Sequence, residues 1–239
     1  MKKWIIRILV FILLIALIAG GYIVYQGHSM YKEALNNISL SEKIAKVQQD
    51  DSYVQLDTLP VDYKNAVISV EDHRFYKHGS IDLIAIGRAV VTNIRYGKFL
   101  EGGSTISQQV AKNLYFISND TNAMYRKVAE VFMAHDLESN YKKDEILELY
   151  INTIYFGDGY YGIEEACQGY LKKSAKDMTL YEATQMAGIP NAPSVYAPTA
   201  NLNLTLSRQK KVVSTMVENG YLSQEQADEI LAKQPEVSQ

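Results

Sequence analysis

Apolar residues divide the chain into one uninterrupted run and a series of shorter periodic segments. From Ile8 to Tyr25 there are 18 residues without a charge, nearly all apolar, which is about the length that a helix needs to cross ~30 Å of hydrocarbon. After this run, apolar residues recur at three- and four-residue spacing, while period-2 alternation is scarce, so we predict a mainly α fold. Helices are predicted over residues 104–116, 123–139, 143–153, 161–172, 179–188, 205–219 and 223–233, and from Thr58–Pro60 onward.

The charges around the apolar run indicate its orientation. Lys2, Lys3 and Arg7 precede it, and the positive-inside bias places this short leader in the cytoplasm and the chain after about Gln26 outside. A cleaved signal peptide is the alternative, with residues 16–21 as a weak cleavage site. The predicted division of the chain is a leader and transmembrane anchor (1–27), a juxtamembrane linker (28–56) and one domain (57–239).

The composition excludes two classes of protein. The chain has 24 basic and 27 acidic residues, and three of the basic ones lie in the leader, whereas a nucleic-acid binder has an excess of basic residues. Cys167 is the only cysteine, which excludes an internal disulfide and a cysteine-based zinc site. The four histidines show no metal-ligand spacing.

Glu71 is the first candidate for chemistry, because it interrupts an apolar stripe. Ile68 lies one helical turn before it, and desolvation in such a position raises the pKa of a carboxyl toward the range useful for proton transfer. Asp72 raises that pKa further by like-charge repulsion. The alternative is a carboxylate at a helix end that pairs with Arg74 or Lys77.

A second candidate is the segment EGGSTISQQVAKN, residues 101–113. Two glycines precede a possible capping box of Thr105 and Gln108, and the free N–H groups of a helix start bind anions readily. Ser104, Gln108 and Lys112 recur every four residues on one helix face, an arrangement that suits a phosphate or diphosphate. The alternative is an ordinary capped amphipathic helix.

A third candidate is the segment that contains Arg126, Lys127 and Glu130. Arg126 and Glu130 are four residues apart, so one interpretation is a surface ion pair that contributes a few tenths of a kcal/mol. The functional interpretation is a second carboxylate beside two cations, facing the same cleft as Glu71.

Taken in order, five segments resemble the motifs of the family-51 peptidoglycan glycosyltransferases, a domain also found at the front of bifunctional penicillin-binding proteins. They are EDHRFYKHGSID (71–82), GGSTISQQVAKN (102–113), RKVAE (126–130), EILELYINTIYFGDGYYGIEEA (145–166) and LYEATQMAGIPNAPSVYAP (180–198). The resemblance covers roughly residues 57–220. Three departures are Ser80 in place of the usual Gly, a loop 114–125 without Arg, and Tyr170-Leu171-Lys172 in place of Tyr-Phe-Gly.

The resemblance implies a two-lobed domain with a lysozyme-like large lobe and a smaller lobe that enters the membrane. It implies polymerisation of lipid II into glycan strands in bacterial cell-wall synthesis, by inverting β-1,4 transfer with release of undecaprenyl diphosphate. Glu71 matches the general base and Glu130 the second essential carboxylate, whereas Lys112, Arg126 and Lys127 match the groups at the diphosphate. The other positions expected at the substrate are Asp72, Ser104, Thr105, Gln108, Gln109 and Asn113.

The resemblance also implies partners and a location. A divalent cation, Mg²⁺ or Mn²⁺, is expected to assist, and no residue is assigned to it. The expected partners are lipid II, the growing glycan strand, the bacterial membrane and other cell-wall synthesis proteins, and not nucleic acid. We expect a single-pass protein of the cell membrane with its catalytic domain on the extracellular side. Candidates for an apolar, membrane-facing lobe are Ile94, Phe99, Leu100, Tyr115 and Phe116, with ordinary core as the alternative.

Two other functions compete with this interpretation. A lysozyme-like hydrolase or lytic transglycosylase cuts glycan with one acidic Glu and needs no diphosphate site, so residues 102–113 argue against it. A membrane-tethered scaffold protein has no use for a carboxylate on an apolar stripe, as at Glu71.

Overall fold

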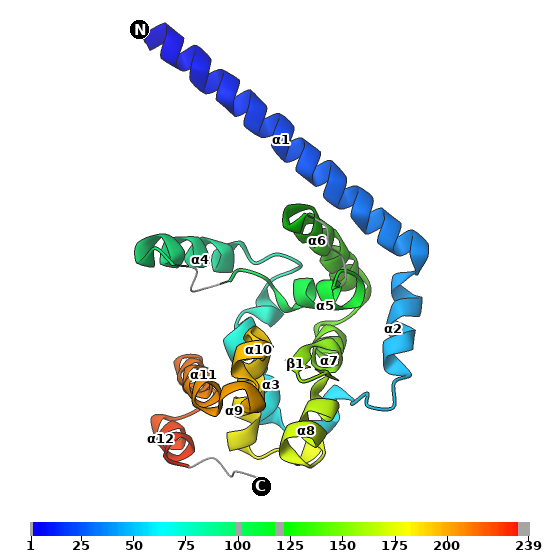
Figure 1. Cartoon of the computed structure of the whole chain (residues 1–239), viewed down its shortest axis with the longest axis vertical. Coiled ribbons are helices and arrows are strands. Elements are labelled where there is room, and N and C mark those ends of the chain that lie inside the picture. Colours follow the sequence, from blue (N-terminus) through cyan, green and yellow to red (C-terminus); the bar gives the residue numbers. More distant parts are fainter. Residues whose placement is uncertain (1, 99–101, 118–121, 234–239) are drawn as a thin grey trace.

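The computed structural model of the chain describes residues 2–98, 102–117 and 122–233, and its described part is mainly helical (Figure 1). Its helices and strands are α1 (Lys2–Asn37), α2 (Leu40–Gln48), α3 (Val61–Glu71), α4 (Leu83–Tyr96), α5 (Ile106–Tyr115), α6 (Ala123–Asn140), α7 (Lys143–Thr153), β1 (Tyr155–Gly157), β2 (Tyr160–Tyr161), α8 (Ile163–Leu171), α9 (Leu180–Gly188), α10 (Pro193–Tyr196), α11 (Pro198–Glu218) and α12 (Gln224–Ala232). The strands form an antiparallel hairpin. The predicted mainly α fold is confirmed.

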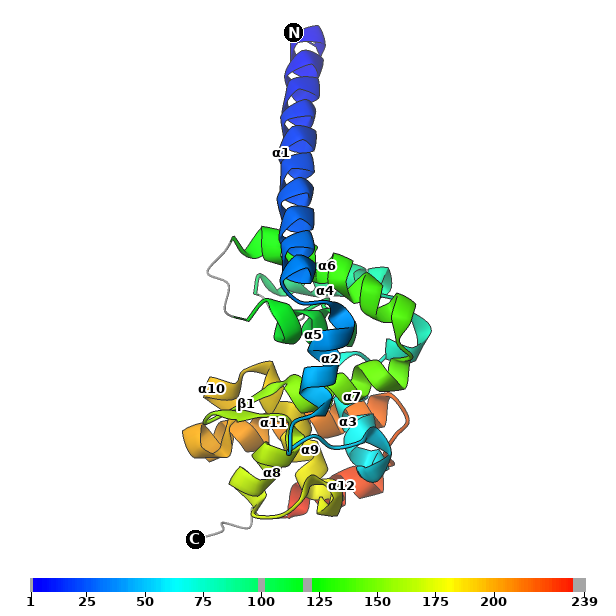
Figure 2. The ribbon, with the colours of Figure 1, turned by 90° about the vertical axis from the view of Figure 1, so that its right-hand side faces the viewer.

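The helices fall into two groups along the long axis of the molecule. Figures 1 and 2 show α4, α5 and α6 close to α1, with α3 and α7 to α12 farther from it. Helix α5 packs against both α6 and α7, and therefore lies where the two groups meet. This arrangement is the expected two-lobed architecture.

Helix α1 projects from the domain (Figure 2). Within the described residues it is the one helix, Lys3–Asn37, that is long and apolar enough to cross a membrane. Its C-terminal part packs on α6, because Gly27 leaves no room for a side chain: a Cβ there would lie 2.4 Å from the Cβ of Val128. Tyr31 stacks on Phe132 with ring centroids 5.7 Å apart. The segment assigned from the sequence to a juxtamembrane linker thus contains the end of α1 and all of α2.

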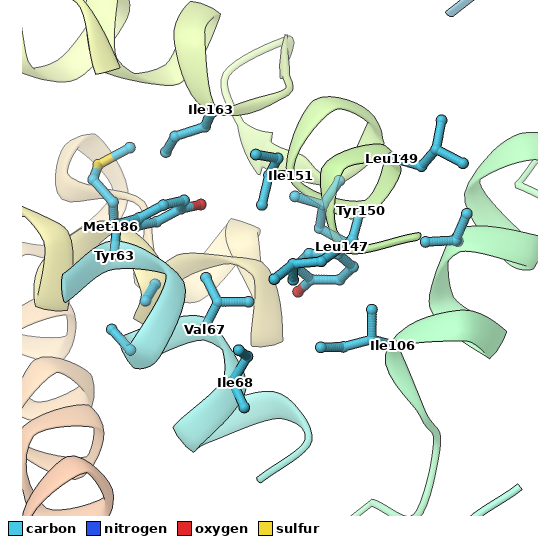
Figure 3. Close-up of a cluster of buried hydrophobic side chains, with 14 of the residues drawn as sticks. Tyr63, Val67, Ile68, Ile106, Leu147, Leu149, Tyr150, Ile151, Ile163 and Met186 are labelled. Atoms are coloured by element: carbon cyan, nitrogen blue, oxygen red, sulfur yellow. The ribbon is translucent and has the colours of Figure 1, made fainter. Parts of the chain in front are cut away.

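The core forms around α3 and α7 (Figure 3). Tyr63 and Val67 of α3 are buried against Tyr150 and Ile151 of α7, and Met186 of α9 closes one side. Removing apolar surface from water stabilises such a cluster by about 25 cal/mol per Å². The core therefore fixes α3, which ends at Glu71, relative to the helices around it.

Helices α4, α10 and α11 differ from the prediction. Neither α4 nor α10 was predicted. The apolar residues of α4 gather on one side of the helix, but that side is not packed into the core, and Ala89 is the only residue buried between Leu83 and Tyr96. Helix α11 begins at Pro198 rather than at residue 205, across a kink at Asn201 where the backbone leaves helical geometry.

Candidate active site

Glu71 is the last residue of α3 and is held at the meeting point of the two groups of helices. Only 10% of its side chain is exposed, and the Nη2 atom of Arg208 lies 3.9 Å from its Oε1. The amide of Gln109 donates a hydrogen bond of 2.9 Å to its Oε2. Oε1 is buried and accepts no hydrogen bond from any described residue.

The environment of Glu71 raises its pKa. Burial is the largest cause, while the hydrogen bond from Gln109 and the charge of Arg208 act in the opposite direction, and the charge of Asp72 adds a smaller upward contribution. A raised pKa makes a carboxylate a stronger base. The sequence interpretation of a desolvated carboxylate therefore agrees with the structure. Arg74, the alternative partner, pairs instead with Asp82 at 3.0 Å.

The turn after Glu71 is tied to α5 by buried hydrogen bonds. One oxygen of Asp72 accepts from the backbone N–H of Ile106 at 3.1 Å, and the other lies 2.7 Å from the Nε2 of His78. The backbone carbonyl of Ser80 accepts from the side chains of Thr105 and Gln108 at 3.1 and 2.8 Å. Three side chains expected at the substrate, those of Asp72, Thr105 and Gln108, therefore hold this turn against the start of α5.

Of the two hydrogen bonds of the predicted capping box of α5, the structure contains one. Thr105 is the N-cap and accepts from the backbone N–H of Gln108. The side chain of Gln108 bonds to Ser80 instead of returning to Thr105. The departure from the family pattern at position 80 lies at this contact, and it is the backbone of Ser80 that takes part.

Helix α6 presents the second carboxylate with its two cations. Glu130 is 4% exposed, and its oxygens lie 3.0 Å from the Nζ of Lys127 and 3.6 Å from the Nε of Arg126. Lys127 also donates to the hydroxyl of Ser104 at 2.8 Å. Because Glu130 is buried, the pair with Arg126 differs from the solvent-exposed ion pair that was the alternative.

A groove extends from α5 toward the hairpin. Its volume is about 230 Å³, and it is bounded by α2, α5, α7 and β2. Asn113 lies in its wall with a buried side-chain nitrogen that has no partner among the described residues. Tyr53, Asn152, Tyr161 and Glu165 also line it. Lys112, the neighbour of Asn113, is exposed on α5.

The structure thus joins most of the predicted residues through hydrogen bonds and ion pairs. Glu71 contacts Gln109 on α5, and Ser104, before α5, contacts Lys127, which pairs with Glu130. Lys112 and Asn113 lie on the same helix, but no hydrogen bond or ion pair among the described residues joins them to this set. Arg208 was not predicted; its guanidinium faces Glu71 and also donates to the carbonyl of Gly188 at 3.3 Å. No local pattern marked it, because α11 approaches α3 only in the folded chain.

The expected divalent cation has one candidate cluster among the described residues. Ligand atoms of Asp72, His78 and Asp82 lie within 4.8 Å of one another. Their carboxylate oxygens already accept hydrogen bonds, however: those of Asp72 as described above, and those of Asp82 from Arg74 and from the backbone N–H groups of Ile84 and Ala85. These contacts engage both oxygens of each carboxylate, and we assign no metal ligands to this cluster.

Comparison with known proteins identifies the class to which this site belongs. The profile of the transglycosylase family matches residues 37–217. The chain is therefore a member of the transglycosylase family, and the family inferred from the five motifs is confirmed.

Individual relatives are larger proteins. The chain is 38% identical over 237 residues to penicillin-binding protein 1F of Bacillus subtilis (strain 168), which covers 95% of this chain and 33% of that protein. It is 40% identical over 206 residues to penicillin-binding protein 1A of Neisseria lactamica, covering 85% and 26%. Among solved structures it is similar to penicillin-binding protein 1A from Haemophilus influenzae, with 29% identity, a TM-score of 0.38, and coverage of 54% and 16%. The chain thus spans a third or less of the length of these relatives.

Proposed function

We propose that this chain is a membrane-anchored peptidoglycan glycosyltransferase that polymerises lipid II. The observation that carries the proposal is Glu71, a buried carboxylate with a raised pKa and one oxygen that accepts no hydrogen bond from the described residues, in a member of the transglycosylase family. Burying a carboxylate whose hydrogen bonds are incomplete costs stability, and a perturbed pKa of this kind is typical of groups that transfer protons.

In the proposed reaction, Oε1 of Glu71 takes the proton of the 4-hydroxyl on the acceptor's N-acetylglucosamine. The oxygen attacks the anomeric carbon of the donor, and the bond from that carbon to the diphosphate breaks. The diphosphate leaves with the electron pair, and the α-linked donor becomes a β-1,4-linked unit by inversion. General-base assistance of this kind contributes ~10²–10⁴-fold to a rate.

Cations next to the leaving group stabilise the negative charge that develops on it. Lys112, Arg126 and Lys127 are proposed for this role. Glu130 supports the assignment, because its contacts at 3.0 and 3.6 Å orient Lys127 and Arg126. A divalent cation remains an expectation, and we assign it no ligands.

The groove beside α5 suits an extended sugar chain. Its wall combines amide and carboxylate side chains with tyrosine rings, the mixture of hydrogen-bonding groups and flat apolar faces that binds pyranose rings. The unpartnered amide of Asn113 points to a ligand that supplies a hydrogen-bond acceptor. We assign this groove to the glycan strand.

The lipid part of the substrate requires an apolar surface near the membrane. Leu83 and Ile94 of α4 are 77% and 76% exposed, and α4 lies among the helices nearest to α1 (Figure 1). We assign α4 to the membrane-facing lobe, with the catalytic domain on the extracellular side. Of the residues expected there, Phe99 and Leu100 lie outside the described residues. Tyr115 and Phe116 pack in or against the core, which agrees with the alternative of ordinary core for these two residues.

The test is incubation of the purified protein with lipid II in detergent, followed by digestion of the product with a muramidase. Polymer that the muramidase cleaves into disaccharide units is the expected result. Release of reducing sugars from preformed glycan would instead indicate a hydrolase. No reaction in either assay would indicate a scaffold protein.

A further inference from the structure

The turn after Glu71 contains a buried pair of titratable side chains that the proposed reaction does not use. Asp72 and His78 each have only 5% of their side chains exposed, and His78 Nε2 lies 2.7 Å from Asp72 Oδ1. The ring of His78 also meets the edge of Phe75, at 6.4 Å between centroids. The pair is therefore shielded from water on the side of the core.

The donors and acceptors around the ring of His78 determine how many protons this pair holds. His78 Nδ1 lies 2.6 Å from the backbone carbonyl oxygen of Gly79, and a carbonyl only accepts, so Nδ1 carries a proton. In a neutral imidazole the other nitrogen then presents a lone pair, which a carboxylate oxygen at 2.7 Å would repel. A second proton must therefore lie between Nε2 and Oδ1, on whichever of the two atoms holds it.

The charged groups around the pair are compatible with this extra proton. Asp82, at the start of α4, has a carboxylate oxygen within 4.8 Å of the ligand atoms of Asp72 and His78. Arg74 offsets the charge of Asp82 through its contact of 3.0 Å. From α5, the neutral backbone N–H of Ile106 faces the second oxygen of Asp72. The shared proton is thus the positive charge nearest to the carboxylate of Asp72.

We propose that Asp72 and His78 share a buried proton and act as a positioning pair for Glu71. Asp72 follows Glu71 directly, and its bond to Ile106 joins the end of α3 to the start of α5, the helix from which Gln109 donates to Glu71. Loss of the shared proton places a lone pair against a carboxylate, which separates the two side chains. The end of α3 is then held less firmly against the start of α5, and the carboxylate of Glu71 is no longer held in position for the proposed proton transfer.

The shared proton is measurable without any substrate, so this measurement stands apart from the proposed function. We would label the histidines with ¹⁵N in the full chain in detergent micelles and assign the His78 signals by their absence in His78→Gln. At pH 7.5 both ring nitrogens of His78 should carry a proton or share one. A free, unprotonated nitrogen in His78 would overturn the proposal, as would selective broadening of its signals by stoichiometric Mn²⁺, which would identify a metal site.

Asp72→Asn supplies a variant with the opposite expectation. The amide oxygen still accepts from Ile106, and the amide NH₂ donates to Nε2, so the same joint forms with a neutral imidazole. His78 should therefore change to a single-proton form in this variant. If both nitrogens stay protonated, the carboxylate does not hold the second proton and the inference fails.

The positioning role itself rests on the proposed function and is tested by kinetics. His78→Gln should lower kcat for lipid II polymerisation by roughly 10- to 100-fold with little change in KM, because small misplacement of a reacting group has effects of this size. His135→Gln, at an exposed position on α6, is the matched control and should behave like the parent. A His78→Gln protein with the kcat of the parent would contradict the positioning role.

Discussion

Replacing Glu71 with glutamine separates its role in catalysis from its role in the fold. The amide keeps the size of the side chain, and its oxygen still accepts the hydrogen bond that Gln109 donates. It cannot take a proton from a sugar hydroxyl. A general base contributes ~10²–10⁴-fold, or about 3–5 kcal/mol of activation free energy. We expect a loss near the upper end, because the carboxylate nearest to Glu71, that of Asp72, is held by Ile106 and His78 and cannot replace it as the base.

The same substitution should make the protein less sensitive to alkaline pH. Burial raises the pKa of Glu71, so the folded state binds a proton more tightly than the unfolded state. The resulting stability is fully present below the unfolded pKa and is lost as pH rises toward the folded pKa. Each unit of upward shift corresponds to ~1.4 kcal/mol lost. Glu71→Gln removes this loss, although Arg208 then faces an uncharged group at 3.9 Å.

Two assays on the same preparations decide the matter. Lipid II polymerisation should collapse in Glu71→Gln, while thermal unfolding measured from pH 5 to pH 8 should show a variant that becomes more stable relative to the parent as pH rises. Polymerisation within a few-fold of the parent would refute the assignment of Glu71 as the base. A parent and variant with parallel pH profiles of stability would refute the claim that burial raises the pKa.

Three further predictions concern the anchor and the cations. Gly27→Val should destabilise the protein by about 1–3 kcal/mol, because the added side chain overpacks the contact between α1 and α6. Gly21→Val is the control and should not destabilise it, because no atom lies within 4 Å of a Cβ at that position. Equal thermal unfolding of the two variants in detergent would count against the contact at Gly27. Lys112→Ala should lower the rate of polymerisation strongly without unfolding the protein. Lys176→Ala, at another exposed position, is the control. Equal turnover of the two variants would contradict the placement of Lys112 at the diphosphate. Deletion of residues 1–21 should give a soluble, folded and active protein, as judged by gel filtration and polymerisation, since it leaves the packed end of α1 intact; an aggregated or unfolded product would contradict this.

The sequence predicted those features of the fold that depend on neighbours along the chain. Most helices of the domain follow from three- and four-residue spacing, and Glu71 was recognisable because a carboxylate on an apolar stripe is expensive to bury. Helix α4 was not predicted, although its apolar residues gather on one side of the helix, which is the pattern that predicted the other helices. Hydrophobicity also cannot tell a residue that faces lipid from one that faces the core, as Ile94 and Phe116 show.

The parts of the site that could not be predicted depend on contacts between distant segments. Arg208 lies 137 positions after Glu71 and reaches it only because α11 packs against α3. The bonds from Thr105 and Gln108 to the carbonyl of Ser80 involve a backbone atom, which no sequence pattern reveals. The proton shared by Asp72 and His78 could not be predicted either, because it is inferred from the two acceptors that face the His78 ring, the Asp72 carboxylate and the Gly79 carbonyl.

The continuity of α1 has a consequence for how such an enzyme moves. A helix rises 1.5 Å per residue, so the 36 residues of α1 span about 54 Å, of which a bilayer core takes ~30 Å. Contacts of α1 with α6 include Tyr22, whose ring lies 6.3 Å from that of Tyr125, and Gly27, two residues after the apolar run ends, so no flexible tether separates the run from the domain. In the proposed membrane-anchored enzyme, Glu71 therefore stays at one height above the lipid surface, while the protein as a whole can diffuse within the plane and turn about the anchor. The glycan strand of the proposed reaction then has to slide past Glu71, because this residue cannot rise to follow the strand.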